Sequence, residues 1–312
     1  MDIIRDSQFI APAQRCAVIA IGNFDGVHAG HAAVIDHARQ IAQQMNAPLG
    51  VLTFEPHPRQ FFIPDGPTFR LMDAATRAEQ LRESGVQRLY ELPFNSALAE
   101  LSAEDFIQKI LHERLGVKHV VVGQDFHFGK GRSGNAAMLA EMGEHLGFGV
   151  TVAPLIALTG KEVSSTAIRT ALAEGRPRDA AAMLGHVHRI EGIVEHGDQR
   201  GRELGFPTAN IGINGLHMPR FGVYATTVIV RDGPYAGQYL GATSIGSRPT
   251  FGVNKPNCET YLLDFRGDLY GARISVGLVD YLRPELKFDS IDALITQMHA
   301  DVIEARRILA DV

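Results

Sequence analysis

Two histidines, His28 and His31, lie at the end of a turn rich in small residues. The apolar run at 17–21 is typical of a buried parallel strand, and residues 32–45 show apolar side chains at helical spacing. The first N–H groups of a helix are unpaired and its dipole favours negative charge, so the turn suits a nucleotide phosphate. We expect the imidazoles to stabilise a transition state, with nucleotide contacts from Gly22, Asn23, Phe24, Asp25 and Gly26.

Two other interpretations of the histidine pair stay open. The pair could bind a metal, although no cysteine or third histidine lies nearby in the sequence. Both could also be ordinary solvated residues. The common phosphate-loop patterns G-x-x-x-x-G-K-[ST] and G-x-G-x-x-G are absent. The turn instead reads G-x-F-D-G-x-H-x-G-H, which resembles the H-x-G-H signature of nucleotidyltransferases that adenylylate small phosphates and release pyrophosphate.

A second group of phosphate contacts is expected around residues 164–169. Ser164, Ser165 and Thr166 precede a short helical pattern that contains Arg169. We expect Ser165 to be the N-cap. A plain helix cap is one interpretation, and a triphosphate clamp made of hydroxyls, a helix N-terminus and an arginine is the other.

Two further strand ends carry candidate substrate contacts. Phe54 and Glu55 end the second predicted strand, and Glu55 could orient a substrate or help to hold Mg²⁺. Asp125 and Phe128 follow the strand at 120–122, where Phe126 and Phe128 would share one side of an extended chain. The two rings could stack on a planar ligand, although core packing is the alternative for one of them.

The second half of the chain holds a Gly- and Arg-rich loop whose N–H groups could bind an anion. An ordinary loop with solvated arginines is the alternative. Thr208 and Asn210 follow it, share a face of an extended chain and offer hard oxygen ligands for Mg²⁺. Glu259, at the start of a predicted strand, could accept a proton from a hydroxyl, although a lone glutamate there is usually just solvated. The expected nucleotide contacts in the loop are Gly197, Arg200, Gly201, Gly205 and Pro207.

The elements that must position these residues change in type near residue 185. Before it, apolar strands alternate with helices, which predicts an α/β domain with a doubly wound parallel sheet. Ligands in such sheets bind at the carboxyl ends of strands, where His28 falls. After it, short β-branched and aromatic runs at 190–194, 223–230, 239–245, 260–265 and 274–281 predict an antiparallel barrel or sandwich, closed by an amphipathic helix at 291–309. We expect two domains, 1–184 and 185–312.

Composition limits the class of protein. The 312 residues carry a formal net charge of −5, so no global basic field indicates a nucleic-acid partner. No apolar run approaches the roughly 18 residues that a membrane helix needs. The first 15 residues are polar and lack the pattern of a signal peptide. Two reduced thiols, Cys16 and Cys258, in a cytoplasmic protein are the expectation.

Together these motifs resemble the prokaryotic bifunctional riboflavin kinase/FMN adenylyltransferase family over nearly the whole chain. The Pro-Thr-Ala-Asn motif in a glycine-rich loop is more specific than the adenylylation motif, which is shared with relatives that act on other substrates. Their order on one chain strengthens the resemblance. In the first half it rests on residues 22–31, 54–58, 125–129 and 164–169, and in the second on 200–210, 222–225, 245–251, 259 and 268–271.

The resemblance implies two reactions that use ATP as co-substrate and Mg²⁺ as cofactor. The second domain, a small flavokinase barrel, would phosphorylate riboflavin to FMN, and the first would adenylylate FMN to FAD. His28 and His31 would stabilise adenylyl transfer, Ser164, Thr166 and Arg169 would grip phosphates, and Glu259 would be the kinase base. Thr208 and Asn210 would position Mg²⁺–ATP. The expected flavin contacts are Phe54, Glu55, Asp125 and Phe128.

Some positions depart from the common family pattern, and other functions stay open. Glu55 replaces a frequent aspartate, His188 a frequent aromatic residue and Tyr261 a frequent histidine, which puts affinities in doubt more than activities. Only one domain could be active, with the barrel as a flavin-binding regulatory module. The first domain could instead adenylylate another phosphate, such as a nicotinate mononucleotide. We expect a monomer or a weak homo-oligomer, and no nucleic-acid or membrane partner.

Overall fold

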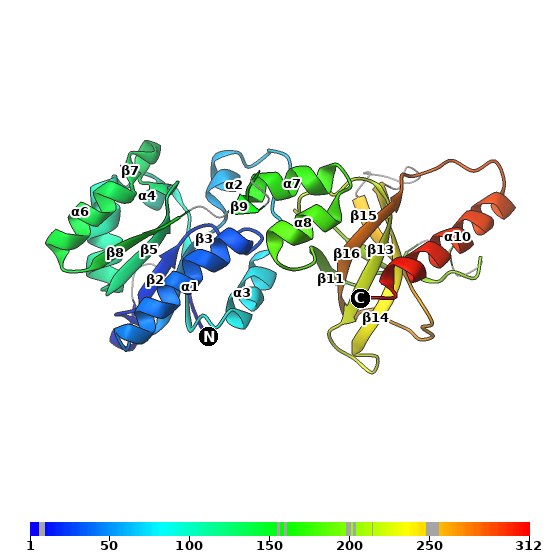
Figure 1. The fold of residues 1–312 in the computed structure, drawn as a ribbon, viewed down its shortest axis with the longest axis horizontal. Helices are drawn as coiled ribbons and strands as arrows, with labels where there is room; N and C mark the ends of the chain where they lie inside the picture. The colour runs from blue at the N-terminus through cyan, green and yellow to red at the C-terminus, as the bar shows by residue number, and fades with distance from the viewer. Residues whose placement is uncertain are drawn as a thin grey trace. The chain divides into compact units, whose positions relative to one another are not determined.

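The structure, a computed structural model, describes residues 1–5, 10–154, 157–158, 161–197, 201, 204–213, 215–247 and 256–312. The chain forms two compact units. Unit 1 comprises residues 1–67 and 74–164, and unit 2 comprises residues 68–73 and 165–312. Figure 1 labels many of the elements of both units.

Unit 1 is built on a six-stranded sheet in which every strand pair is parallel. The strand order reverses between β2 and β5, because the chain continues from β2 to its neighbour β3 on one side and returns to β5 on the other. This is the switch point at which doubly wound sheets bind ligands. In spatial order the strands are β1 (Asp2–Ile4), β4 (Arg88–Pro93), β3 (Leu49–Glu55), β2 (Val18–Ile21), β5 (His119–Gly123) and β8 (Gly149–Ala153).

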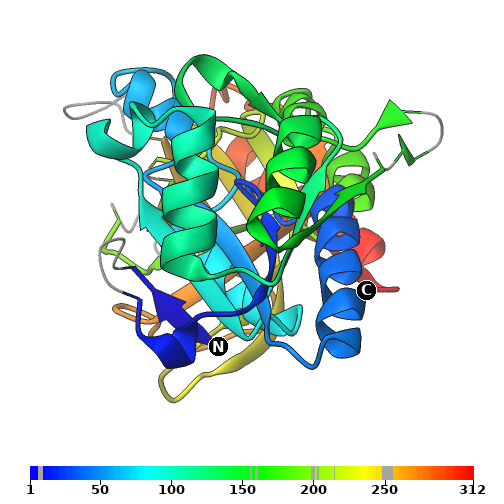
Figure 2. The ribbon, with the colours of Figure 1, turned by 90° about the vertical axis from the view of Figure 1, so that its left-hand side faces the viewer.

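Helices cover both faces of this sheet. Helix α1 (Ala29–Gln44) packs on β2, β3 and β5, whereas η2 (Phe106–Leu115) and α6 (Ala136–Leu146) pack against each other over the opposite face. In Figure 2, α1 (blue) stands on one side of the strands and η2 (teal) on the other. Shorter elements of the unit are η1 (Pro12–Gln14), α2 (Pro58–Phe62), α3 (Ala74–Glu83), α4 (Ser96–Ala99), α5 (Ala103–Asp105), β6 (His127–Phe128), η3 (Lys130–Arg132), β7 (Gly134–Asn135), β9 (Ala157–Leu158) and β10 (Lys161–Glu162).

Unit 2 contains an antiparallel sheet that is nearly closed into a barrel. An isolated antiparallel bridge between Glu195 and Asn210 brings the ends of the first and last strands together. The barrel core consists of apolar residues from all six strands, and it includes Ile190, Ile211 and Cys258. In spatial order the strands are β11 (Arg189–Ile193), β16 (Arg273–Arg283), β13 (Gly222–Val230), β14 (Gly237–Ser247), β15 (Pro256–Leu262) and β12 (Thr208–Gly212).

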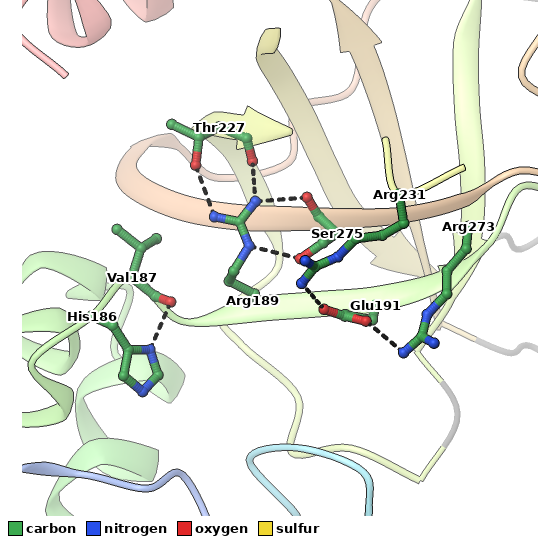
Figure 3. Close-up of polar contacts among 8 residues, drawn as sticks. All are labelled: His186, Val187, Arg189, Glu191, Thr227, Arg231, Arg273 and Ser275. Atoms are coloured by element: carbon green, nitrogen blue, oxygen red, sulfur yellow. Dashed lines mark hydrogen bonds and ion pairs between the residues drawn. The ribbon is translucent and has the colours of Figure 1, made fainter. Parts of the chain in front are cut away.

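A polar network ties strand β11 to its neighbours, as Figure 3 shows. The Arg189 guanidinium donates to the hydroxyl and carbonyl oxygens of Ser275 and of Thr227. Glu191 lies between Arg231 and Arg273, with an N···O distance of 2.8 Å to each. Burial, and then the charge of Arg231, lower the pKa of Arg189 to about 10. The network therefore fixes β11 laterally on β16 and β13.

Helices α7 (Ser165–Ala173), α8 (Pro177–Leu184) and α10 (Ile291–Leu309) also belong to the described part of unit 2. Helices α7 and α8 form a small core with Leu71 of the segment 68–73. The closing helix α10 packs on the barrel through Ala305 and Leu309. A two-point ion pair between Arg283 on β16 and Asp301 on α10 holds this helix in place.

The expected fold class is confirmed, and several elements differ in extent. The first helix begins at Ala29 rather than at residue 32, because the side chain of His28 accepts a hydrogen bond from the third residue after it. Strand β12 joins the five predicted barrel runs, and β1 adds an edge to the parallel sheet. The units meet in sequence between Ser164 and Ser165, so α7 and α8 associate with the barrel. The boundary at 184/185 stays a prediction about where an independent fragment begins.

Candidate active sites

The first site is the turn between β2 and α1 at the switch point of the parallel sheet. The rings of His28 and His31 stack, with centroids 3.6 Å apart and an angle of 16° between their planes. Phe24, which is buried, packs its ring 5.0 Å from that of His31. The sequence-predicted histidines therefore lie together at the start of α1.

The two histidines make different hydrogen bonds. The backbone N–H of His31 donates to His28 Nδ1 at 3.3 Å, so His28 caps α1 and a neutral His28 carries its proton on Nε2. Burial, and then the nearby His28, hold the pKa of His31 well below its usual 6.5. His31 Nδ1 is buried without a hydrogen-bond partner within the described part of the chain. A neutral donor next to a helix N-terminus is thus available to an incoming anion.

Small residues shape this turn because rings occupy the space that a side chain would need. A Cβ added at Gly22 would lie 3.3 Å from the Phe24 ring, and one at Gly30 would lie 3.1 Å from the His28 ring. Val27 has a positive φ of 41°, which is rare for a β-branched residue. Strain of this kind is concentrated at functional sites.

Buried polar groups support the turn from the neighbouring strand and helix. The carbonyl oxygen of Asn23 accepts hydrogen bonds from Thr53 Oγ1 at 3.2 Å and from Arg77 Nη1 at 3.4 Å. Arg77 also pairs with Glu55 at 2.9 Å. Sequence reasoning missed Arg77, because its partners lie on other elements and no local pattern marks it.

An aromatic cluster of Phe54, Phe61, Phe62 and Phe94 lies around the ends of β3 and β4. Phe94 contacts the other three rings, with centroids 5.3 to 5.8 Å apart. Phe62 is 64 % exposed, so part of the cluster faces solvent. Of this cluster only Phe54 was predicted as a site residue from the sequence.

The other two expected flavin contacts occupy different environments. Phe128 is buried in the core beside Phe106, and its ring stacks at 5.3 Å on half-buried Phe126. Asp125 is exposed after β5. The two phenylalanines thus pack together as expected, with Phe128 on the core side, and the roles of Asp125 and Phe128 in binding stay predictions.

The expected phosphate clamp spans the boundary of the two units in sequence. Helix α7 begins at Ser165, so the residue before it is Ser164, and the prediction of Ser165 as N-cap was wrong by one position. A Cβ at Gly30 would lie 3.6 Å from the carbonyl oxygen of Val163, which places this segment of unit 1 beside the start of α1. Arg169, like Thr166, belongs to unit 2, where its Nε donates to the Phe69 carbonyl at 2.6 Å.

The second site is a polar row on one face of β12 and β15. The antiparallel register places Asn210 opposite Glu259 and Thr208 opposite Tyr261. These four residues are half-buried, whereas the residues between them, such as Ala209 and Thr260, point into the core. From the sequence, Glu259 was expected at the start of a strand. It lies within β15 instead, because this strand begins at Pro256.

Local hydrogen bonds orient the row. Asn210 Nδ2 donates to the carbonyl of Thr208 at 3.1 Å and to its hydroxyl at 3.4 Å, so Asn210 Oδ1 is the atom that could coordinate a cation. Asn257, a residue that sequence reasoning missed, donates from Nδ2 to Glu259 Oε1 at 2.8 Å. Hydroxyl, amide and carboxylate oxygens are the donors that Mg²⁺ prefers. The row therefore fits a hard divalent cation.

Around this row lie an aromatic group and part of the glycine-rich loop. Phe206 contacts the rings of Tyr261 and of His299 on α10 at 5.2 and 5.0 Å. A Cβ at Gly201 would overlap the carbonyl of Phe206, and Gly205 has a φ of 87°, so both positions require glycine. Gly197 and Pro207 lie at the two ends of the loop, whereas the predicted contact Arg200 lies outside the described residues.

A cavity of about 290 Å³ opens near this loop in unit 2. Tyr270, one of its lining residues, packs against His196, whose ring centroid is 3.8 Å away and which directly precedes Gly197. The cavity is lined by residues 232–235 and 268–272. Its walls thus combine aromatic rings with the carboxylates of Asp232 and Asp268.

Among the described residues, no group of three or more His, Cys, Asp and Glu side chains could hold a metal ion. No helix in the described part of the chain is long and apolar enough to cross a membrane. Cys16 and Cys258 are free thiols, and burial raises the pKa of Cys258 to about 12.

Comparison with known proteins identifies relatives of both units. The family model described as FAD synthetase matches residues 10–167, and the one described as riboflavin kinase matches residues 184–309. The chain is 42% identical to the bifunctional riboflavin kinase/FMN adenylyltransferase of Pseudomonas fluorescens, over 99% of this chain and 98% of that protein. It is 36% identical to the protein of that name in Bacillus subtilis, over 99% of this chain and 98% of the relative.

A solved structure covers both units as well. A crystal structure from Streptococcus pneumoniae, described as a macrolide-efflux protein, matches with a TM-score of 0.87 and 31% sequence identity. The match covers 97% of this chain and 98% of the other. The curated relatives over the same length carry the names of two flavin-modifying activities instead.

Proposed function

The chain belongs to the family of bifunctional riboflavin kinase/FMN adenylyltransferases, and we propose how its residues divide the two reactions. The protein is a transferase that phosphorylates riboflavin to FMN and adenylylates FMN to FAD. Its first domain is of the FAD synthetase type and its second of the flavokinase type. We assign adenylyl transfer to the turn at the start of α1 and riboflavin phosphorylation to the polar row of β12 and β15.

Adenylyl transfer joins the phosphate of FMN to the α-phosphorus of ATP and releases pyrophosphate. The proposal rests on the buried, unpartnered Nδ1 of His31 beside a helix N-terminus. Negative charge grows on the α-phosphoryl oxygens as the new bond forms, and His28 Nε2–H and neutral His31 donate to them. Ser164, Thr166 and Arg169 bind the remaining phosphates in this proposal.

The flavin ring of FMN needs an aromatic surface beside that phosphate site. We assign it to the aromatic cluster of Phe54, Phe61, Phe62 and Phe94, because its rings are partly exposed and lie near the carboxyl ends of β3 and β4. Apolar contact and stacking with a planar ring stabilise such a complex. Glu55, at the end of β3, would then lie on the polar side of the ring.

Riboflavin phosphorylation moves the γ-phosphoryl group of ATP to the riboflavin 5′-hydroxyl. Thr208 and Asn210 would hold Mg²⁺, which neutralises charge on the ATP phosphates when bound. Glu259, directly opposite Asn210, accepts the proton that the hydroxyl loses. The cavity lined in part by Tyr270 is large enough for an adenine ring, and Phe206, Tyr261 and His299 offer aromatic surface for riboflavin.

One assay tests the assignment of both reactions. The pure protein is incubated with riboflavin, ATP and MgCl₂, and riboflavin, FMN and FAD are separated by chromatography. We expect FMN to appear first and FAD to follow, with ADP and pyrophosphate as co-products. FAD from supplied FMN without kinase activity would support the alternative of a barrel that only binds flavin. Repeating the assay with EDTA and then excess Mg²⁺ tests the metal, and we expect both reactions to stop and recover.

The place of action is also a proposal. Two free thiols and the use of ATP support a cytoplasmic enzyme. Its oligomeric state, expected to be a monomer or a weak homo-oligomer, stays a prediction that light scattering can test.

A further inference from the structure

We propose that Arg77 is a positioning residue for adenylyl transfer, which fixes both the phosphate-binding turn and the carboxylate of Glu55 from behind the site. This inference rests on the proposed function of the turn. Arg77 lies on α3 and is fully buried.

The guanidinium of Arg77 connects three separate elements of unit 1. Its Nη2 donates to Glu55 Oε2 at the end of β3 and to Glu91 Oε2 on β4, both at 2.9 Å. Its Nη1 donates to the Asn23 carbonyl, which belongs to the turn after β2, at 3.4 Å. One side chain therefore sets the relative positions of two strands, β3 and β4, and of the turn.

The two carboxylates around Arg77 differ in exposure, which indicates different roles. The buried one holds Arg77 in place, and the more exposed one can contact a ligand. The Glu91 side chain is only 3% exposed, and its other oxygen accepts from Arg5 Nε at 2.8 Å. The Glu55 side chain is 33% exposed and ends the strand beside Phe54, a member of the aromatic cluster. Glu91 thus anchors Arg77, and Arg77 in turn holds Glu55 at the solvent-accessible edge, where we place the flavin.

The hydrogen bond from Arg77 to the Asn23 carbonyl orients the peptide group of the turn. Thr53 Oγ1 donates to the same carbonyl at 3.2 Å, so two buried donors hold this oxygen toward β3 and α3. In a trans peptide the C=O and the following N–H point in opposite directions. Holding the carbonyl of Asn23 therefore directs the N–H of Phe24 away from the core, toward the side where we place the phosphates.

Lysine cannot replace this arginine, although it would keep the charge. The planar fork of arginine presents five donors in fixed directions, whereas an ammonium group is a compact point charge on a flexible stem. An ammonium at this place could pair with the carboxylates but would lose the simultaneous contact with the turn. Arg77→Lys thus keeps the buried positive charge and removes the contact that positions the turn.

The test compares Arg77→Lys with two controls on the same helix. We expect the kcat of FMN adenylylation to fall about 10- to 100-fold, as when supporting residues of a site are removed. Riboflavin kinase activity of the same preparation should not change, because its proposed residues lie in unit 2. Arg82→Lys changes an exposed arginine of α3 and should have wild-type kcat. Leu81→Ala removes a buried side chain outside the polar network and should lower the melting temperature while kcat stays near wild type.

A second variant tests the turn without disturbing the ion pairs. Thr53→Val removes one donor to the Asn23 carbonyl and should lower kcat about 2- to 10-fold. In combination with Arg77→Lys, its effect should be smaller than in the wild type, because both act on one carbonyl. These results, with KM for riboflavin in the kinase reaction unchanged, support the proposal.

Three outcomes overturn it. The first is a wild-type kcat for Arg77→Lys, and the second is an equal loss of both enzyme activities in that variant. The third is a fall of kcat in Leu81→Ala as large as the fall in Arg77→Lys, when both variants have the same melting temperature. A wild-type protein that makes no FAD overturns the proposed function, and with it the role of Arg77. The wild-type assay thus separates the two failures.

Discussion

Burial determines what each histidine of the first site can do. His28 uses its Nδ1 to accept a backbone hydrogen bond, which leaves Nε2 as its donor. Burial, and then the nearby His28, keep the pKa of His31 well below 6.5, so His31 stays neutral at physiological pH. A neutral His31 can therefore donate a hydrogen bond to the transition state. It adds no positive charge, which would bind the pyrophosphate product as strongly as it binds the transition state.

We predict that His31→Ala nearly abolishes FAD formation and leaves FMN formation intact. Loss of a preorganised donor to a developing charge typically costs about 10²- to 10³-fold in rate. The measurement is the rate of each product from riboflavin and from supplied FMN. An equal loss of both activities in a folded protein, judged by circular dichroism, would contradict two separate sites.

Asn210→Ala is the matched control, with the reverse expectation. FMN production should collapse while supplied FMN is still converted to FAD, because Asn210 lies in unit 2 opposite the proposed base. If instead this variant lost FAD synthesis and kept kinase activity, the assignment of the two reactions would be inverted.

His188 makes the stability of unit 2 depend on pH. Burial, and then the neighbouring His186, His217 and Arg189, lower the pKa of His188 from 6.5 to about 3. The unfolded chain binds a proton first as the pH falls below 6.5, so this contribution to stability is present at neutral pH and is lost toward pH 3. We expect His188→Phe to reduce the slope of the unfolding free energy by about 1.4 kcal/mol per pH unit between pH 6 and pH 4.

The measurement is urea denaturation of the full chain at several pH values, following the transition of unit 2. His145→Gln, at an exposed position of α6, is the control and should leave the slope unchanged. A slope for His188→Phe equal to that of the wild type would show that this histidine is protonated in the folded protein.

Sequence reasoning at this scale found residues that stand in contiguous motifs. His28, His31, Thr208 and Asn210 each belong to a motif whose spacing alone indicates chemistry. Arg77 could not be found in this way, because its meaning comes from Glu91 and Asn23, which are distant in sequence. For Ser165, an error of one residue at a helix start was enough to misplace the cap.

At the scale of elements, periodicity located strands and helices better than their ends. The five predicted barrel runs became strands, but β15 begins before Glu259, and the segment that holds Thr208 and Asn210, expected only as an extended chain, forms strand β12 of the barrel. Pairing with β15 decides its structure, since each of its residues has a partner across the ladder. The barrel, rather than local propensity, therefore creates the polar row.

A substitution at the start of α1 should change stability and activity in opposite directions. Gly30→Ala favours the helix, by up to about 1 kcal/mol, yet its Cβ would press on the His28 ring at 3.1 Å. We expect the melting temperature to stay the same or rise, and FAD formation to fall about 10-fold as His28 shifts.

The control for this prediction is Ala32→Gly, at an exposed position one residue beyond His31. It should lower stability by about 1 kcal/mol without touching the His28 ring, so FAD formation should persist. The two variants are compared by thermal melting and by the kcat of FMN adenylylation. Loss of activity in Ala32→Gly alone would contradict the proposed steric role of Gly30.

At the scale of the whole molecule, the composition change near residue 185 indicated two domains, and the contacts define two units. Sequence could not show that residues 68–73, in the middle of the first domain, pack with α7 and α8. This association depends on Leu71 and on the contacts of Phe69 with Arg169, which no local pattern reveals.

We predict that a fragment of residues 184–312 folds as a cooperative unit and phosphorylates riboflavin. The barrel core begins at Ile190, and the polar row, the cavity and α10 all lie within the fragment. What it lacks from α8 includes the ion pair of Arg178 with Asp280, which is largely exposed and is worth at most about 1 kcal/mol. A longer fragment, 165–312, should melt at a higher temperature because α7 and α8 then cover the barrel.

The closing helix supplies the discriminating control. A fragment of residues 184–289 lacks α10, so Ala225 and Leu240 lose their cover and Arg283 loses its partner Asp301. Removing one member of a mostly buried ion pair costs about 3 kcal/mol, and exposed apolar area adds to that loss. We therefore expect no cooperative melt for 184–289, beside a cooperative melt and riboflavin-dependent ADP release for 184–312. A cooperative melt of 184–312 without ADP release would mean that residues before 184 complete the kinase site, and no melt at all would mean that the barrel requires α7 and α8 in order to fold.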